Sequence, residues 1–244
     1  MLSSELPFSV RRLRCRLVAA AAVVFVGADM LLVPPNVAEA VRAAVAAETP
    51  LTPHDIYFGA SHTHCGPGAW GPGIASRVTG GKYDPDIVAL LSERFASAII
   101  EAYQGLEPAR LGRGGVDAAA FIRNRARDAE IDTELGYLHV VQDDGDACFL
   151  VRFSAHPTIY GGGMLEFSAE YPGALQRTLA RGTGAEVVYL GGALGSSGPR
   201  APEAATPDAR VQAMGEGLAG LILEEFREGR LPDYTLAADI SAVG

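Results

Sequence analysis

Cysteine is scarce in this chain, and its few cysteines are far apart. The three, Cys15, Cys65 and Cys148, are odd in number and form no Cys-x-x-Cys pair. This pattern excludes a cysteine zinc ribbon and a disulfide framework, and it leaves the redox compartment undetermined.

Basic charge is also in short supply. The chain has 20 Lys and Arg against 29 Asp and Glu, a net charge of −9, and its pI is about 5.0. Basic residues gather only between Arg11 and Arg16. A nucleic-acid-binding surface would need a basic patch, so we expect no nucleic-acid partner and a small neutral or cationic substrate.

A hydrophobic run long enough to cross a membrane is missing as well. The apolar stretch Leu17 to Ala28 is too short for a transmembrane helix. We interpret it as a buried strand, which favours a cytoplasmic protein with no transmembrane segment. A signal peptide is the alternative, because basic residues precede the stretch and Val26 and Ala28 are placed as small residues before a cleavage point.

The rest of the chain alternates strand-like and helix-like stretches. Its 244 residues, 48% of them hydrophobic, are enough for one core, so we expect a single α/β domain over residues 1–244, with 1–16 disordered or vestigial. Strands are predicted at Leu17–Ala28, Asp55–Ser61, Leu135–Gln142, Ala147–Ala155, Glu186–Leu190 and Tyr234–Val243. Helices are predicted at Pro35–Ala47, Asp84–Tyr103, Pro172–Arg181 and Pro207–Arg227.

The turn at residues 143–146 contains Asp-Gly and joins two of these strands, which predicts a β-hairpin. The helices between other strands are typical of crossover connections. The predicted fold is therefore α/β, with a mixed sheet, crossover helices, at least one hairpin, and a functional edge at the carboxyl ends of the strands.

Three of the five histidines come where a predicted strand ends. His62 and His64 follow strand Asp55–Ser61, and His156 follows strand Ala147–Ala155. Residues two apart on an extended chain point to the same side, so both imidazoles of the first pair can face one site. Neutral imidazole is a common zinc ligand, although His-x-His alone also fits two polar side chains in a glycine-rich loop.

Two glycine-rich segments are less informative. Gly66 to Gly71 matches Gly-x-Gly-x-x-Gly, but Pro72 follows where a dinucleotide-binding helix would begin. Gly191 to Pro199 lacks the lysine of a P-loop and the Gly-x-Ser-x-Gly of a nucleophile elbow. It leaves anion binding through backbone N–H groups open as a less favoured alternative, with Ser197 and Ser196 as unproven nucleophiles.

Five blocks in this order resemble the neutral/alkaline, non-lysosomal ceramidase family, from about Leu17 to the C-terminus. The blocks are SHTHCGPG (61–68), IRNRAR (122–127), FSAHPT (153–158), FSAEYPG (167–173) and VYLGGALGSSGPR (188–200). The resemblance implies a zinc-dependent amidase domain in which His62 and His156 bind zinc. It also implies that His64 and Arg125 contact the substrate and its reacting carbonyl; without it, Arg125 would be interpreted as a surface arginine.

The chain departs from the family at three places, one of which is an N-terminal segment reduced to about sixteen residues. The family has Gly-Asp-x-Ser-Pro where this chain has Gly198 before Pro199, so Ser197 is one residue early as a candidate nucleophile. The family's further zinc ligands, a glutamate and a tyrosine, have no counterpart before Gly244. Glu170 is the local carboxylate that could complete the zinc site or act as a base, although an acid beside a helix start has a structural role of its own.

Together these features predict a zinc-dependent, ceramidase-like hydrolase that cleaves an amide-like N-acyl bond in lipid metabolism. The expected substrate is a small N-acyl or sphingolipid-like molecule, and the expected cofactor is Zn²⁺. The alternative is a catalytically incomplete domain that binds metal or a partner without turnover. With only two histidine ligands, we expect weak zinc binding and poor ceramide hydrolysis.

Overall fold

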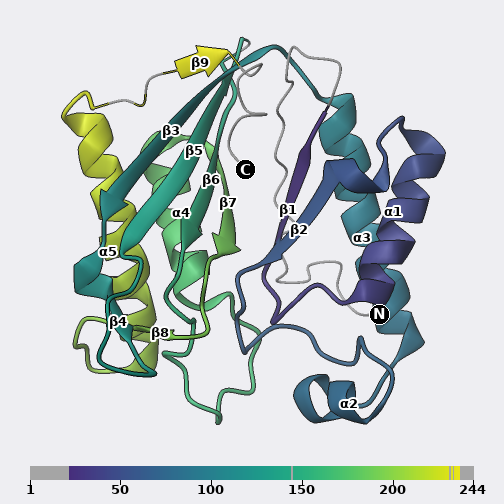
Figure 1. Ribbon diagram of the computed structural model, residues 1–244, viewed down its shortest axis with the longest axis horizontal. Coiled ribbons are helices and arrows are strands. Elements are labelled where there is room, and N and C mark those ends of the chain that lie inside the picture. The colour runs from purple at the N-terminus through teal and green to yellow at the C-terminus, as the bar shows by residue number, and fades with distance from the viewer. Residues whose placement is uncertain (1–21, 144, 231, 233, 237–244) are drawn as a thin grey trace.

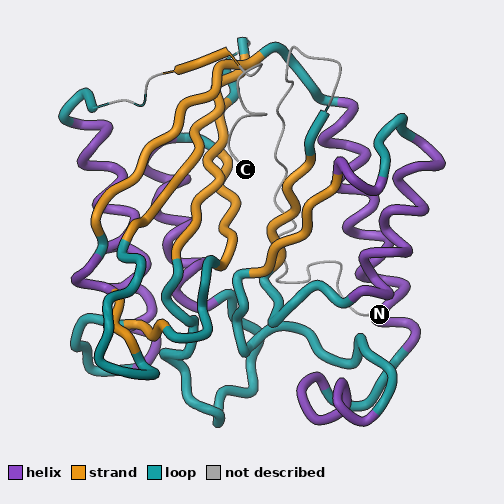
Figure 2. The backbone as a smooth tube through the Cα atoms, viewed as in Figure 1, coloured by secondary structure: helices purple, strands orange, loops and turns teal. Residues whose placement is uncertain are grey.

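The fold contains a five-stranded and a two-stranded β-sheet, each covered by helices, and a further pair of three-residue strands (Figures 1 and 2). The structure is a computed structural model that describes residues 22–143, 145–230, 232 and 234–236. Its helices are α1 (Pro35–Glu48), α2 (Ile74–Gly80), α3 (Pro85–Gln104), α4 (Glu170–Thr183) and α5 (Pro207–Arg227). Its strands are β1 (Val24–Ala28), β2 (Ile56–Ala60), β3 (Ala109–Asp117), β4 (Ile122–Asn124), β5 (Glu134–Gln142), β6 (Ala147–Phe153), β7 (Glu186–Gly191), β8 (Ser197–Pro199) and β9 (Tyr234–Leu236).

The larger sheet has five strands in the order β7-β6-β5-β3-β9. Strands β5 and β6 form the predicted antiparallel hairpin, whereas β6 and β7 are parallel and connected through α4. Helices α4 and α5 cover one face of this sheet (Figure 1). Fully buried side chains such as Phe149, Leu175 and Leu218 fill the space between them.

The smaller sheet is the parallel pair β1 and β2, connected by the crossover helix α1. Helices α1 and α3 lie together against it (Figure 1). The apolar faces of these elements form a second hydrophobic cluster that includes Val41, Ile56 and Phe95. Each sheet therefore has its own helical cover and its own core.

The two sheets meet along β7 without a continuous hydrogen-bonded ladder. A Cβ atom at Gly27 of β1 would collide with Cγ1 of Val188 and lie 2.9 Å from the carbonyl oxygen of Tyr189. A Cβ atom at Gly59 of β2 would meet the Leu190 side chain. Glycine at these two positions lets the β1–β2 pair approach β7 closely.

The predicted mixed α/β fold, with its crossover helices and hairpin, is confirmed. Within the described residues, the stretch Leu17–Ala28 contributes strand Val24–Ala28, and Tyr234–Val243 contributes Tyr234–Leu236. The remainder of both stretches, like residues 1–16, lies outside the described part. No helix in that part is both long and apolar enough to cross a membrane.

Strand β3 was not predicted. Its nine residues include Gly112, Gly114 and Gly115, and glycine weakens the strand signal. The structure explains two of them. A Cβ atom at Gly114 would overlap the ring of Tyr137 on the neighbouring strand β5, and one at Gly112 would lie 2.7 Å from Cγ of Pro232. The short elements α2, β4 and β8 were also missed.

Candidate metal centre

Three histidine side chains come together at the carboxyl ends of two strands. His62 and His64 follow β2, and His156 follows β6. One ring nitrogen from each lies within 4.8 Å of those of the other two. The ring centroids are 4.7 to 5.4 Å apart. This histidine cluster, defined as His62, His64 and His156, could hold a metal ion.

The backbone that presents His62 is not extended. Strand β2 ends at Ala60, and His62 has a φ of 64°, in the left-handed region. The expectation that alternation along an extended strand brings His62 and His64 together is therefore wrong. Histidine enters the left-handed region more readily than most residues, at a cost of about 1–3 kcal/mol.

The loop containing His62 and His64 is held in place by the segment that precedes α4. Thr63 donates a hydrogen bond from its hydroxyl to the carbonyl of Ser168 at 2.7 Å. Cys65 and Ser168 form an isolated antiparallel bridge. A contact between residues about a hundred positions apart therefore fixes the backbone that carries the two histidines.

Backbone carbonyls orient two of the three rings. Nδ1 of His62 lies 2.6 Å from the carbonyl oxygen of Leu31, and Nδ1 of His156 lies 3.3 Å from that of Leu194. With Nδ1 donating to these carbonyls, Nε2 of each ring is free to bind a metal. Nε2 of His64 lies 2.9 Å from Nε2 of His156, so His64 points at the same place.

The surroundings of His64 and His156 favour the neutral form of both rings. Partial desolvation of the ring lowers the pKa of His64, although its side chain is exposed, and the neighbouring His62 and Arg125 lower it further. Burial also lowers the pKa of His156, against the opposing effect of its hydrogen bond to Leu194. Neutral imidazole is the form that binds metal, so the environment favours ligation.

The loop at residues 194–197 ties Arg125 to His156. His156 donates from Nδ1 to the first carbonyl of this loop and from its backbone N–H to the last, at 3.3 and 3.4 Å. Arg125 donates from Nε and from its backbone N–H to the two carbonyls between, at 3.2 and 2.8 Å. Because the loop offers carbonyls to these two residues, it gives no support to anion binding through its N–H groups.

Two of the predicted site residues have other surroundings. Ser197 is 3% exposed and lies in the short strand β8. The Glu170 carboxylate accepts hydrogen bonds from the backbone N–H groups of Ile159, Tyr160 and Tyr171. Among the described residues, the group that could hold a metal contains the three histidines and no carboxylate.

Glu170 instead braces the loop that follows His156. Its carboxylate is buried, and burial raises its pKa to about 7. Its φ of 54° places it, like His62, in the left-handed region. The hydrogen bonds to residues 159 and 160 connect this strained helix start to the chain just beyond His156-Pro157.

A small hollow with a mixed polar and apolar wall adjoins His64. Its volume is about 300 Å³, and the side chains of Leu31, Pro67 and Trp70 form part of its wall. Trp70 is buried and donates from Nε1 to the carbonyl of Pro67 at 2.8 Å. In the sequence, only the Gly-Pro-Gly turn after the histidines signals this hollow.

Solved structures resemble this fold, among them two ceramidases. A neutral ceramidase from Pseudomonas aeruginosa matches with a TM-score of 0.75 and 19% identity, covering 83% of this chain and 36% of its own. The chain has a ceramidase-like fold. A ceramidase complexed with C2 matches with a TM-score of 0.75 and 18% identity, covering 83% of this chain and 35% of its own.

The chain thus spans about a third of the length of these ceramidases. No family model and no curated protein matches its sequence. At this level of identity the ceramidase likeness is one of fold, and it agrees with the resemblance found in the five sequence blocks.

Proposed function

We propose that this chain is a zinc-dependent hydrolase of an amide-like N-acyl bond, with a sphingolipid-like substrate. The observation that carries the proposal is the histidine cluster at the strand ends of a ceramidase-like fold. The ceramidase-like fold suggests the reaction by analogy, and the histidine cluster offers ligands for the metal ion that the reaction would need.

The residues present fit a zinc ion. A catalytic zinc takes three protein ligands and keeps one open position, and three histidines form one such set. His62 and His156 would bind through Nε2, with their Nδ1 atoms held by carbonyls. His64 would complete the set, which amends the expectation of a two-histidine site. Zinc in such a site supplies a Lewis acid for the carbonyl and activates water.

Other side chains of the protein would stabilise the reacting carbonyl and contact the acyl chain of the substrate. Arg125 presents a fixed fork of donors beside the cluster and would stabilise negative charge on the carbonyl oxygen of the substrate. In the hollow beside His64, the apolar side chains of Leu31, Pro67 and Trp70 would contact part of the acyl chain. Leu165 and Phe167, 95% and 56% exposed in the loop after His156, offer further apolar surface to a lipid-like substrate.

A catalytically incomplete domain is the second candidate. Ser197 is buried, so a serine nucleophile has little support at that position. The cluster also lacks a carboxylate among the described residues. Such a domain would bind metal without turnover, and Glu170 would serve only to brace the loop.

Metal content and hydrolysis together test the proposal. The full chain would be dialysed with zinc, freed of excess metal, and assayed on N-acylsphingosines with short and long acyl chains. We expect one zinc per chain and release of fatty acid, both lost in His156→Ala and kept in His54→Ala, an exposed histidine outside the cluster. Bound zinc without turnover would select the incomplete domain, and absence of both would overturn the metal centre.

A further inference from the structure

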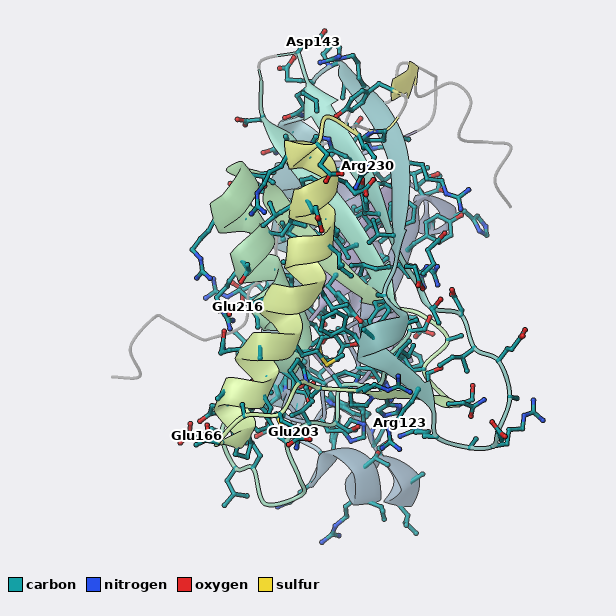
Figure 3. All side chains as sticks on the ribbon, turned by 90° about the vertical axis from the view of Figure 1, so that its left-hand side faces the viewer. Arg123, Asp143, Glu166, Glu203, Glu216 and Arg230 are labelled. Atoms are coloured by element: carbon teal, nitrogen blue, oxygen red, sulfur yellow. The ribbon has the colours of Figure 1, made fainter. Side chains whose placement is uncertain are left out.

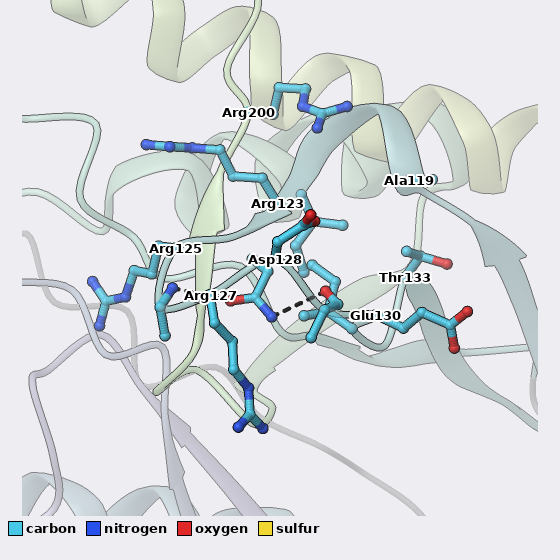
Figure 4. Close-up of a pocket in the computed structure, with 13 residues that line it drawn as sticks. Ala119, Arg123, Arg125, Arg127, Asp128, Glu130, Thr133 and Arg200 are labelled. Atoms are coloured by element: carbon cyan, nitrogen blue, oxygen red, sulfur yellow. Dashed lines mark hydrogen bonds between the residues drawn. The ribbon is translucent and has the colours of Figure 1, made fainter.

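A second, larger and open hollow is lined by arginines (Figure 4). Its volume is about 790 Å³. Asp128 and Glu130 also line it. The arginines in its lining, called the arginine hollow below, are Arg123, Arg125, Arg127 and Arg200.

An ordered loop presents these side chains. The Asn124 side chain accepts hydrogen bonds from the backbone N–H groups of Ala126 and Arg127, each at 3.0 Å, and donates to the carbonyl of Ala129 at 3.0 Å. Strand β4, which leads into this loop, pairs with β8. In Figure 3, Arg123 lies at the end of the molecule opposite the hairpin turn at Asp143.

The four arginines have no carboxylate partner within ion-pair distance in the described part of the chain. The ion pairs there are made by Arg152 and Arg230. Nε of Arg123 and of Arg125 faces a backbone carbonyl instead. Four guanidinium groups against two carboxylates leave the hollow positive in a chain whose net charge is −9. Clustered like charges that lack partners favour a bound anion.

The arginine hollow is joined to the histidine cluster through Arg125. The loop at residues 194–197 holds both Arg125 and His156, as described above. The small hollow borders His64, so an acyl chain placed against its apolar side chains leaves the arginine hollow for the other part of the substrate. Of these two hollows, only the larger is lined by arginines.

We propose that the arginine hollow binds a carboxylate on the amine side of the substrate, so that the substrate class is an N-acyl amino acid. This inference rests on the proposed N-acyl hydrolysis. A planar guanidinium matches a carboxylate with two parallel hydrogen bonds, which an uncharged amino alcohol cannot reproduce. The local excess of arginine therefore outweighs the negative net charge, which alone had favoured a neutral or cationic substrate.

Substrate preference tests the inference. The zinc-loaded chain would be assayed on N-lauroylglutamate and on uncharged N-lauroylethanolamine. We expect a higher kcat/KM for the glutamate compound, through a lower KM that rises with salt. Arg127→Glu combined with Arg200→Glu should reduce the ratio of the two kcat/KM values about 10- to 100-fold, the range for losing charged hydrogen bonds.

A matched variant controls for net charge. Arg94→Glu combined with Arg227→Glu replaces two exposed arginines on α3 and α5 and changes the net charge by the same amount as the hollow variant. It should leave the ratio of the two kcat/KM values unaltered. Equal kcat/KM values for both compounds, unaffected by the hollow variant, would overturn the inference while leaving N-acyl hydrolysis in place.

Calorimetry separates the two proposals if neither compound is hydrolysed. N-lauroylglutamate would be titrated into the full chain in EDTA, with N-lauroylethanolamine as the reference. Tighter binding of the glutamate compound that is lost in the hollow variant would support the arginine hollow even though the proposed hydrolysis had failed. Equal binding of both compounds would overturn it.

Discussion

At the scale of single residues, His64 has two roles open to it. It is exposed, and no carbonyl fixes its Nδ1 among the described residues, in contrast to His62 and His156. As a ligand it would complete the zinc site; as a free base it would pass a proton to the leaving amine. The 2.9 Å separation of its Nε2 from that of His156 favours the ligand role.

We therefore expect His64→Ala to weaken zinc binding as strongly as His156→Ala does. The loss should exceed the ~10- to 100-fold typical of removing a group that only orients a ligand. Competition with a zinc-chelating dye measures the affinity. Unchanged affinity with a lower kcat would instead assign His64 to proton transfer.

Glu170 is predicted to make stability depend on pH. Burial raises its pKa from 4.5 to about 7, so the folded chain keeps a proton that the unfolded chain releases. Its contribution to stability is thus full below pH 4.5 and is lost as pH rises through about 7. The free energy of unfolding should fall over this range by up to about 3 kcal/mol more than in Glu170→Gln.

Denaturant unfolding between pH 4.5 and 8 checks this dependence. Glu216→Gln, which changes an exposed glutamate on α5, should follow the wild-type profile. Parallel profiles for the wild type and Glu170→Gln would show that folding leaves the pKa of Glu170 unchanged, and would contradict the prediction.

The sequence identified the histidines but not the geometry that unites them. Placement at two strand ends follows from apolar periodicity, which is local. The left-handed His62 and the carbonyls of Leu31 and Leu194 depend on contacts 31 and 38 residues away, which periodicity does not encode. The bracing role of Glu170 was missed for the same reason.

At the scale of elements, the contact between the two sheets depends on Gly27. An added methyl group there would press on the Val188 side chain and on the backbone of Tyr189, which cannot move aside as a flexible side chain can. We expect Gly27→Ala to reduce the free energy of unfolding by about 1–3 kcal/mol. It should also weaken zinc binding, since β2 and β6 carry different histidines.

Gly220→Ala is the control for this prediction. Gly220 lies inside α5, and a Cβ atom there would have no neighbour within 4 Å. Alanine should stabilise the helix by up to about 1 kcal/mol and leave zinc affinity as it is. Thermal unfolding and zinc titration of both variants decide whether β1–β2 must approach β7 closely.

The helices that begin with a clear N-cap residue and a proline in the first turn were predicted well. The N-caps Asp84 and Thr206 accept hydrogen bonds from Asp86 and Ala209, and Pro85 begins α3. Strands β4 and β8 have three residues each and exist through pairing with each other across more than 70 positions. Such pairing leaves no local pattern, so the arginine hollow that it supports could not be foreseen.

At the scale of the whole molecule, we propose that residues 1–244 form a single catalytic domain despite the two hydrophobic clusters. The histidine cluster takes ligands from both sides of the contact between sheets. Zinc bound only by the folded chain should raise its Tm by mass action, in one cooperative transition. Calorimetry with zinc and with EDTA measures this shift, and His156→Ala should abolish it. Two separate transitions in zinc would contradict the single domain.

The order of elements along the chain gives this arrangement a practical consequence. Residues 22–104 build the smaller sheet and its helices, and residues 109–236 build the larger one. A cut between Gln104 and Ala109 would leave His62 and His64 on one fragment and His156 on the other. The chain is therefore a natural candidate for a split protein, whose two pieces would each hold part of a metal site and reassemble in response to zinc.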